Sequence, residues 1–374
     1  MTRIIRQASW IVCILAGCVT VRARADSRPT DKGDGTILAD AHAALDAGHA
    51  ERALTLLKTR GLTIDRAERR SIEGRAHLLC GELVMARRKL RTALRLRSHH
   101  AADHYWLGRV HQAGGAPALA TKSYHAAWQN GMETADLHTR WAECLRDSGR
   151  VLGELRQLEW DDPEAAPPSP GDFVDDGCVI GTVRRDDRRL LIAPRDSALC
   201  QIHKALILDP NRGAILLLCG ELWAAAEHHR RAVDRFEQAA GRLEAEPLAR
   251  CHTQWAASSL ALGDFDGYLK HMRKGMQLSG GVDEAELARC YDRAARESAN
   301  RGDLQRQIRY LLFAAELKSD VDRFLRLADA LILAHRTPDA AAYLQQALDH
   351  KPTRQQRRAI QQRLIRTTYL ASPQ

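Results

Sequence analysis

The chain has 374 residues, a length that fits two ordinary domains or one long repeat array. Hydrophobic residues make up 45% of the sequence, which permits a continuous core and excludes wholesale disorder. The formal net charge of +9 is distributed among many acidic residues, and the basic stretches lack the interleaved aromatic residues that stack on bases. We therefore expect no nucleic-acid partner. The near absence of strand-like runs favours a helical protein.

The first residues have the pattern of a bacterial export signal. Arg3 and Arg6 precede an apolar stretch over residues 8–21, which is too short to span a bilayer comfortably. Two processing sites fit this segment. Residues 15–18 (LAGC) resemble the lipobox of bacterial lipoproteins, in which the thiol of Cys18 is acylated. Residues 23–25 (ARA) fit ordinary signal peptidase, with cleavage before residue 26.

We expect residues 1–25 to be a signal peptide, with the lipobox ending at residue 18, and residues 26–35 to be a flexible tether. The body of the protein is then exported. It is either a lipoprotein on the periplasmic side of a membrane or a soluble periplasmic or secreted protein. The remaining interpretation is a cytosolic protein with an apolar N-terminal helix.

From residue 36 onwards, one spacing recurs about every 34 residues. A small residue lies seven positions before a glycine, and an alanine follows that glycine by five. The glycine suits a tight turn because a positive φ costs it little. The small residues allow the two helices of a hairpin to approach closely. The first three copies are Ala41, Gly48 and Ala53; Gly74, Gly81 and Ala86; and Gly108, Gly115 and Ala120.

These positions resemble the tetratricopeptide repeat (TPR) family, most clearly at residues 106–108 (WLG) and at Ala120, Tyr124 and Ala127. The resemblance covers residues 38–352 in about eight copies. It implies an all-α fold, a right-handed superhelical solenoid of helix hairpins. The later copies keep the frame at Trp141, Ala142, Gly149 and Leu158; at Gly220, Ala232, Phe236 and Ala239; at Ala256, Gly263 and Met272; at Ala295, Gly302, Leu311 and Ala314; and at Ala328, Ala340, Leu344, Ala347 and Pro352.

The repeat frame breaks after Trp160, where the prolines of residues 163–170 cannot be helical. Residues 178–183 and 190–192 flank a polar turn at Arg185, Asp186 and Asp187 and predict a β-hairpin. This hairpin is either a tolerated insertion or a partner-binding or dimerising element, because an exposed strand edge can accept another strand.

We therefore divide the body into a first TPR block of about four repeats (36–160), an insertion (161–195) and a second block of about four and a half (196–352). The second block begins at Ala198, Ile202, Ala205 and Pro210, which match the second half of a repeat with no obvious first half. Residues 353–374 form a capping helix and tail. Thr353 caps that helix, and Ile360, Leu364 and Ile365 face the last repeat.

Candidate chemistry in the sequence is sparse. There is no phosphate loop, H-E-x-x-H motif or nucleophile elbow. Most of the cysteines occupy helix positions that need a small apolar residue, and Cys178 with Cys200 is the only pair considered for a disulfide. We expect no cofactor and no metal. The histidine clusters are interpreted as solvated helix ends, at His99, His100 and His104 and at His228 and His229. Cys251–His252 and Cys200–His203 are interpreted as packing residues rather than nucleophile–base pairs.

In this family the first helix of each hairpin lines the concave groove. The resemblance therefore implies a groove lined by eight residues, in which the arginines and the tyrosine are common binding anchors. The family's carboxylate clamp needs asparagine and lysine at these positions, so that function is not expected. The eight residues are Arg75, Tyr105, Arg109, Glu143, Arg146, Arg289, Asp292 and Arg296.

Four arginines on one side of a second helix, Arg87, Arg88, Arg91 and Arg95, form either a solvated face or a patch for lipid headgroups or an acidic partner. Together these features predict a non-catalytic scaffold of the bacterial cell envelope that binds a partner protein or peptide. One alternative is a module associated with an envelope or polysaccharide assembly machine. Another is an enzyme with an unrecognised site.

Overall fold

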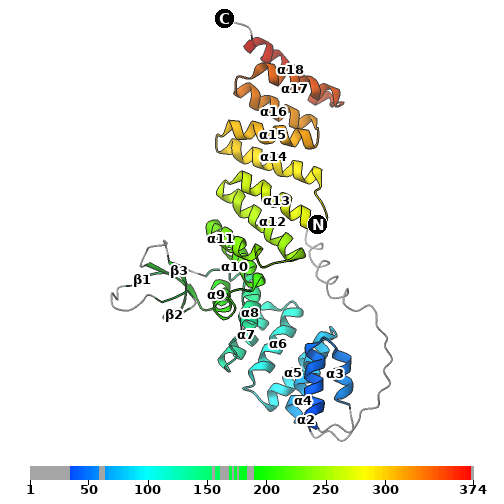
Figure 1. Cartoon of the computed structure of the whole chain (residues 1–374), viewed down its shortest axis with the longest axis vertical. Helices are drawn as coiled ribbons and strands as arrows, with labels where there is room; N and C mark the ends of the chain where they lie inside the picture. Colours follow the sequence, from blue (N-terminus) through cyan, green and yellow to red (C-terminus); the bar gives the residue numbers. More distant parts are fainter. Residues whose placement is uncertain are drawn as a thin grey trace.

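The computed structural model describes residues 34–58, 64–153, 156–160, 168–170, 172–174, 177–182 and 189–371. These residues form seventeen helices, α2 to α18, stacked into an elongated array with a small sheet at its side (Figure 1). The export signal with Cys18 and the polar turn at residues 185–187 lie outside the described residues. No described helix is both long and apolar enough to cross a bilayer.

Consecutive helices pair into antiparallel hairpins, as the repeat spacing predicts. In the first three, α2 (Asp34–Asp46) pairs with α3 (Ala50–Leu56), α4 (Arg66–Leu79) with α5 (Leu83–Leu96), and α6 (Ala101–Ala113) with α7 (Pro117–Gln129). The predicted turn glycines Gly48, Gly81 and Gly115 have φ values of +78°, +77° and +69°. A side chain would be strained there, which explains the recurring glycine.

The small residue of the first helix sets how closely the second helix packs. A Cβ atom built on Gly108 would lie 2.5 Å from the ring of Tyr124, and one built on Gly74 would lie 2.6 Å from Leu90. Gly220 has the same relation to Phe236, at 2.6 Å. The bulky residue of the second helix therefore occupies the space that the glycine leaves empty.

The fourth hairpin is interrupted. Helix α8 (Ala135–Asp147) packs against α9 (Ala198–Leu208), although the whole insertion separates them in sequence. After the insertion, the backbone returns to the end of α8 and begins α9 there. The amide of Ala198 donates to the carbonyl of Arg150 at 2.9 Å. The half-repeat that begins at Ala198 thus has α8 as its first half.

Two expectations about the insertion are therefore wrong. Leu158 does not belong to a second helix but to strand β1 (Arg156–Glu159). The insertion does not divide the solenoid into two blocks, because one hydrophobic core continues from Tyr105 through α8 and α9 to Cys251. The sequence frame is misleading here, since the partner of α8 lies beyond the prolines.

The insertion folds into a four-stranded antiparallel sheet in the order β1-β4-β3-β2. The predicted hairpin is present as β3 (Gly177–Thr182) and β4 (Arg189–Pro194), whereas β1 and β2 (Phe173–Val174) are not predicted. One face of the sheet joins the core beside α9 through the side chains of Cys178, Ile180, Leu191 and Ala193. The sheet is also held by α11, from which Arg231 donates to the carbonyl of Thr182 at 2.6 Å.

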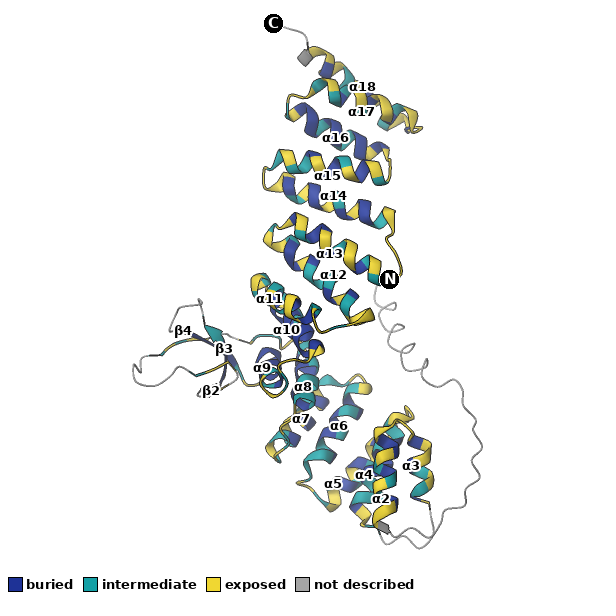
Figure 2. Cartoon of the chain, viewed as in Figure 1, coloured by how far each residue is buried: buried dark blue, intermediate teal, exposed yellow. Residues whose placement is uncertain are grey.

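Four more hairpins complete the stack of eight, followed by a single helix. These elements are α10 (Gly213–Ala225) with α11 (His229–Ala240), α12 (Ala245–Leu262) with α13 (Phe265–Leu278), α14 (Glu284–Asn300) with α15 (Leu304–Leu317), α16 (Val321–Leu333) with α17 (Thr337–Asp349), and α18 (Arg354–Ala371). Buried residues face the neighbouring helices throughout the array (Figure 2).

Helix α18 caps the array, as predicted. The hydroxyl of Thr353 accepts from the amide of Gln356 at 3.2 Å and begins the helix. Ile360 is fully buried and Leu364 packs on the same core. Ile365 is 71% exposed, so its expected contact with the last repeat is wrong: one position along the helix from Leu364 it faces solvent.

Candidate functional site

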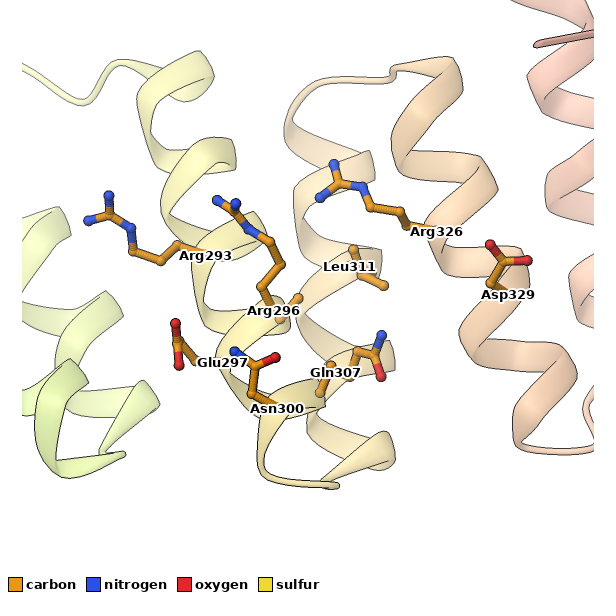
Figure 3. Close-up of a pocket in the computed structure, with 10 residues that line it drawn as sticks. Arg293, Arg296, Glu297, Asn300, Gln307, Leu311, Arg326 and Asp329 are labelled. Carbon is orange, nitrogen blue, oxygen red and sulfur yellow. The ribbon is translucent and has the colours of Figure 1, made fainter. Parts of the chain in front are cut away.

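Two adjoining hollows of about 530 and 580 Å³ lie along the first helices α12, α14 and α16. They share Arg293, Arg296 and Arg326 in their linings. Arg289 lines the second hollow. Figure 3 shows Arg293 and Arg296 projecting from α14, and Arg326 reaching back from α16 above Leu311 of α15. We call the surface formed by these four arginines the arginine groove.

Helical periodicity places three of the arginines together. Residues 289, 293 and 296 follow the spacing i, i+4 and i+7, which returns to one face of a helix. The opposite face of α14 carries the buried residues Ala288, Ala295 and Ser298. The helix begins at Asp283, whose carboxylate accepts from the amides of residues 285 and 286 at 2.9 and 3.3 Å. The sequence thus produces an amphipathic helix α14, with buried residues on one face and three arginines on the solvent-facing side that lines the hollows.

Asp292 holds the fourth arginine in place. Its buried carboxylate accepts from Nε of Arg323 at 2.8 Å and from Nη2 of Arg326 at 3.0 Å. Arg323 is itself only 6% exposed and donates also to the carbonyl of Lys318 at 2.7 Å. The carboxylate of Asp292 is therefore fully occupied within the fold, and its effect on the groove is to orient Arg326.

Arg293 and Arg296 are exposed, and they differ from the other two arginines because no carboxylate among the described residues forms an ion pair with either. Arg289 is paired with Glu286 on its own helix, through an Nε–Oε2 distance of 2.8 Å. Asp329 at the rim is paired with Arg363 of α18, at 2.7 and 2.8 Å. Two guanidinium groups of the groove thus remain uncompensated.

The floor of the groove is partly apolar. Leu260, Met272 and Leu311 line it from α12, α13 and α15. Burial raises the pKa of the Tyr268 phenol and of the Cys290 thiol, both of which lie in the second hollow. Both groups are therefore protonated at neutral pH, and the groove combines fixed positive charge with an apolar surface.

The other predicted groove residues lie on earlier first helices, where they connect adjacent repeats. Arg75 of α4 stacks over Trp106 of α6, with 4.7 Å between the guanidinium carbon and the ring centroid, and donates to Asp46 at 3.0 Å. Arg109 lies over the same Trp106 ring at 5.5 Å. It also donates to the hydroxyl of Tyr105 at 3.3 Å.

Tyr105 is buried, and its hydroxyl donates to the carboxylate of Asp136 on α8. Burial and this carboxylate raise the pKa of Tyr105. Glu143 accepts from Gln112 at 2.8 Å. Arg146 lies 3.3 Å from Glu221, which also pairs with Arg250. Arg75, Glu143 and Arg146 are thus each satisfied by a neighbouring repeat, whereas Arg109 contacts the ring of Trp106 and the hydroxyl of Tyr105 on its own helix.

The eight predicted residues therefore do not form one site. Arg289, Asp292 and Arg296 come together at the arginine groove, whereas the other five form a ladder of contacts between repeats along α4, α6 and α8. Sequence reasoning missed Arg293 and Arg326. Arg293 follows Arg289 by one helical turn, so an inspection of the whole helix face would have found it. The position of the Arg326 side chain depends on its contact with Asp292 of another helix, which the sequence does not reveal.

The candidate nucleophile–base pairs do not have reactive chemistry. Cys251 is buried and donates to the carbonyl of Phe236 at 3.4 Å, and burial raises the pKa of its thiol to about 12. The pKa of Cys200 is raised by its contact with Cys178 and by burial. His203 donates to the carbonyl of Leu199 at 2.9 Å, and burial lowers its pKa to about 4. These thiols are protonated and poor nucleophiles.

The cysteines of the helices and sheet are buried packing residues, with one exception. Cys80 is exposed at the end of α4. Cys178 and Cys200 are in contact but carry thiols rather than a disulfide. Among the described residues, no three histidine, cysteine or acidic side chains are arranged to hold a metal ion.

Similarity to known proteins is found at the level of the fold only. No protein-family model matches the sequence, and no curated protein matches it. Among solved structures, the C-terminal part of a TPR repeat-containing protein from Cytophaga hutchinsonii superposes with a TM-score of 0.50 at 11% identity, covering 78% of this chain and 99% of that one. A tetratricopeptide repeat protein from Parabacteroides merdae has a TM-score of 0.43 at 14% identity, covering 81% and 99%. The first of these likenesses, together with the eight helix hairpins described above, shows that the chain has the fold of a TPR solenoid.

Proposed function

We propose that the chain is a non-catalytic protein-binding scaffold of the bacterial cell envelope, and that it binds its partner in the arginine groove. The observation that carries the proposal is the pair of exposed, uncompensated guanidinium groups of Arg293 and Arg296 above a partly apolar floor. Charged groups without partners are common at surfaces, but here they line a recess where a ligand would lose contact with water. Fixed donors beside apolar surface are typical of binding sites.

The chemistry of the groove favours binding over catalysis. Arginine stays protonated in proteins, so it cannot act as a general base. The thiol of Cys290 and the phenol of Tyr268 have raised pKa values, because burial disfavours their charged forms. The carboxylates of Asp292 and Glu286 are engaged by arginines. The groove therefore offers positive charge and shape to a ligand.

Site-specific photo-crosslinking in the source organism tests this proposal. A photoreactive amino acid at Asn300 would line the groove, whereas one at Arg309 would lie on the exposed outer side of α15. We expect a discrete protein adduct from position 300 that is absent from position 309. Adducts of equal intensity at the two positions, or none at position 300, would show that the groove is not the binding surface.

The envelope location rests on the sequence of residues 15–18 and the arginines that precede the apolar stretch. We propose that Cys18 is acylated and tethers the solenoid to a membrane. Intact-mass measurement and fractionation of the native chain and of Cys18→Ser in a bacterial host test this. A diacylglycerol-sized addition and membrane association that Cys18→Ser abolishes would support the tether. A soluble chain that begins at Asp26 would refute it and place the scaffold in the periplasm or medium.

A further inference from the structure

We infer that the arginine groove selects an acidic, extended peptide segment of a partner protein, with Arg293 and Arg296 as its anchors. This inference rests on the proposed function and adds the chemistry of the ligand. Arg293, Arg296 and Arg326 line both adjoining hollows, and Arg289 lines the second. Each guanidinium presents a planar fork of donors that matches a carboxylate in two-point geometry.

The groove is organised before a ligand arrives. Arg326 is fixed by its 3.0 Å contact with Asp292, whose carboxylate also neutralises the buried Arg323. The other N–H groups of Arg326 are directed over the hollow, so little side-chain freedom is lost when a carboxylate binds. Arg293 and Arg296 have no carboxylate to give up among the described residues, so a ligand carboxylate there breaks no ion pair.

The lining distinguishes an acidic peptide from a nucleic acid or other polyanion. Glu286, Glu297 and Asp329 alternate with the arginines around the hollows. A phosphate backbone would bring several charges onto these carboxylates, whereas a peptide can present single carboxylates between uncharged residues. Leu260 and Met272, which are only partly buried, offer apolar contacts to the intervening side chains. The best ligand therefore combines spaced acidic residues with apolar ones.

Two other sets of arginines among the described residues differ from the groove. In the ladder from α4 to α8, Arg75 and Arg146 are each paired with an acidic residue. Arg88 and Arg95 of α5 are exposed on a second helix and line none of the described hollows. The selectivity for an acidic segment therefore belongs to the arginine groove, and Arg88 with Arg95 provides a matched surface control.

Fluorescence anisotropy with the full chain tests the inference. The probe is a fluorescein-labelled peptide that repeats Glu-Leu-Pro, in which proline favours an extended backbone. Its control replaces each glutamate with glutamine. We expect the glutamate peptide to bind at about 50 mM salt and to weaken as salt rises, because exposed charges are screened. The glutamine peptide should bind at least about tenfold more weakly.

Three double variants locate the site. Arg293→Glu with Arg296→Glu should weaken binding of the glutamate peptide about tenfold or more, and Arg293→Gln with Arg296→Gln should weaken it less, because repulsion is absent. Arg88→Glu with Arg95→Glu changes the net charge equally and should leave binding within about twofold. Circular dichroism melting should show that all three remain folded, since the substituted side chains are exposed.

Several results would overturn the inference. These are no binding of the glutamate peptide at low salt, equal binding of the glutamine peptide, or equal losses in the groove and α5 variants. If a partner is crosslinked at position 300 but one of these results is also obtained, the proposed scaffold function is retained and only the selectivity for acidic segments is rejected. The chain has its own acidic run at residues 161–164. This run could occupy the groove of a second copy of the chain. If sedimentation shows a dimer and the Arg293→Glu with Arg296→Glu variant is monomeric, the ligand is a second copy and the inference of a separate partner protein is overturned.

Discussion

At the scale of single residues, a missing side chain decides how closely the third hairpin closes. A Cβ atom on Gly108 would lie 2.5 Å from the ring of Tyr124, which is itself fully buried. We expect Gly108→Ala to lower the free energy of unfolding by about 1–3 kcal/mol, because overpacking forces the helices apart. Urea denaturation measures the change. Gly241→Ala is the control, since nothing lies within 4 Å of its Cβ position. Equal losses in the two variants would contradict the packing role.

His203 makes stability depend on pH. Its folded pKa is about 4 because of burial, whereas the unfolded value is near 6.5. Below pH 6.5 the unfolded chain binds a proton that the folded chain does not, so stability falls as pH decreases from 6.5 towards 4. We expect His203→Phe to remove on the order of 2 kcal/mol from the stability lost between pH 7.5 and pH 5.

The measurement for His203 is urea unfolding of each variant at both pH values. His99→Gln serves as the control, because His99 is exposed. If His203→Phe loses as much stability on acidification as the native chain, the buried imidazole is not the group responsible.

At the scale of elements, one buried ion network joins the last two hairpins. Asp292 of α14 binds Arg323 and Arg326 of α16, and both Asp292 and Arg323 are less than 10% exposed. We expect Asp292→Ala to cost about 3–5 kcal/mol in unfolding free energy, because it leaves a buried guanidinium unpaired. The exposed pair Arg336–Asp339 is the comparison. Asp339→Ala should cost less than about 1 kcal/mol by the same urea titration. A small loss in both would show that Arg323 finds another partner.

Elements also differ in how well their neighbours can be inferred. The hairpin turns at Gly48, Gly81 and Gly115 are local, so their spacing alone predicts which helices pair. Helix α9 pairs with α8 across the whole insertion, and no local signal connects them. Strand β1 has a short, mostly exposed sequence, and it becomes a strand because β4 lies beside it.

At the scale of the whole molecule, an open stack of repeats needs a polar end. Helix α18 covers the last hairpin with Ile360 and leaves Ile365 in solvent. We expect Ile360→Ala to lower the free energy of unfolding by about 2–5 kcal/mol and Ile365→Ala to change it by less than about 0.5 kcal/mol. Thermal melting with size-exclusion chromatography checks both, since a loosened cap exposes the apolar surface of α16 and α17. Comparable effects of the two substitutions would show that α18 does not cap the core.

The repeat architecture follows from the sequence by itself. The recurring glycine, alanine and bulky positions each act within a single hairpin, and eight similar hairpins can bury their apolar faces only by stacking. The capping helix and the β3–β4 hairpin are predictable for the same reason, because their signals lie within a few residues. These features depend on backbone conformations and spacings that are local.

The binding surface is decided by the tertiary structure. Arg75 and Arg296 are equivalent in a repeat alignment, because each follows the small residue of its first helix, yet Arg75 is neutralised by Asp46 and Arg296 forms no ion pair with a described carboxylate. Whether a guanidinium is available depends on carboxylates that approach from other turns, helices and repeats, as Asp46 approaches Arg75. Electrostatic compensation is set by distances between side chains in space, and periodicity along the sequence does not contain those distances.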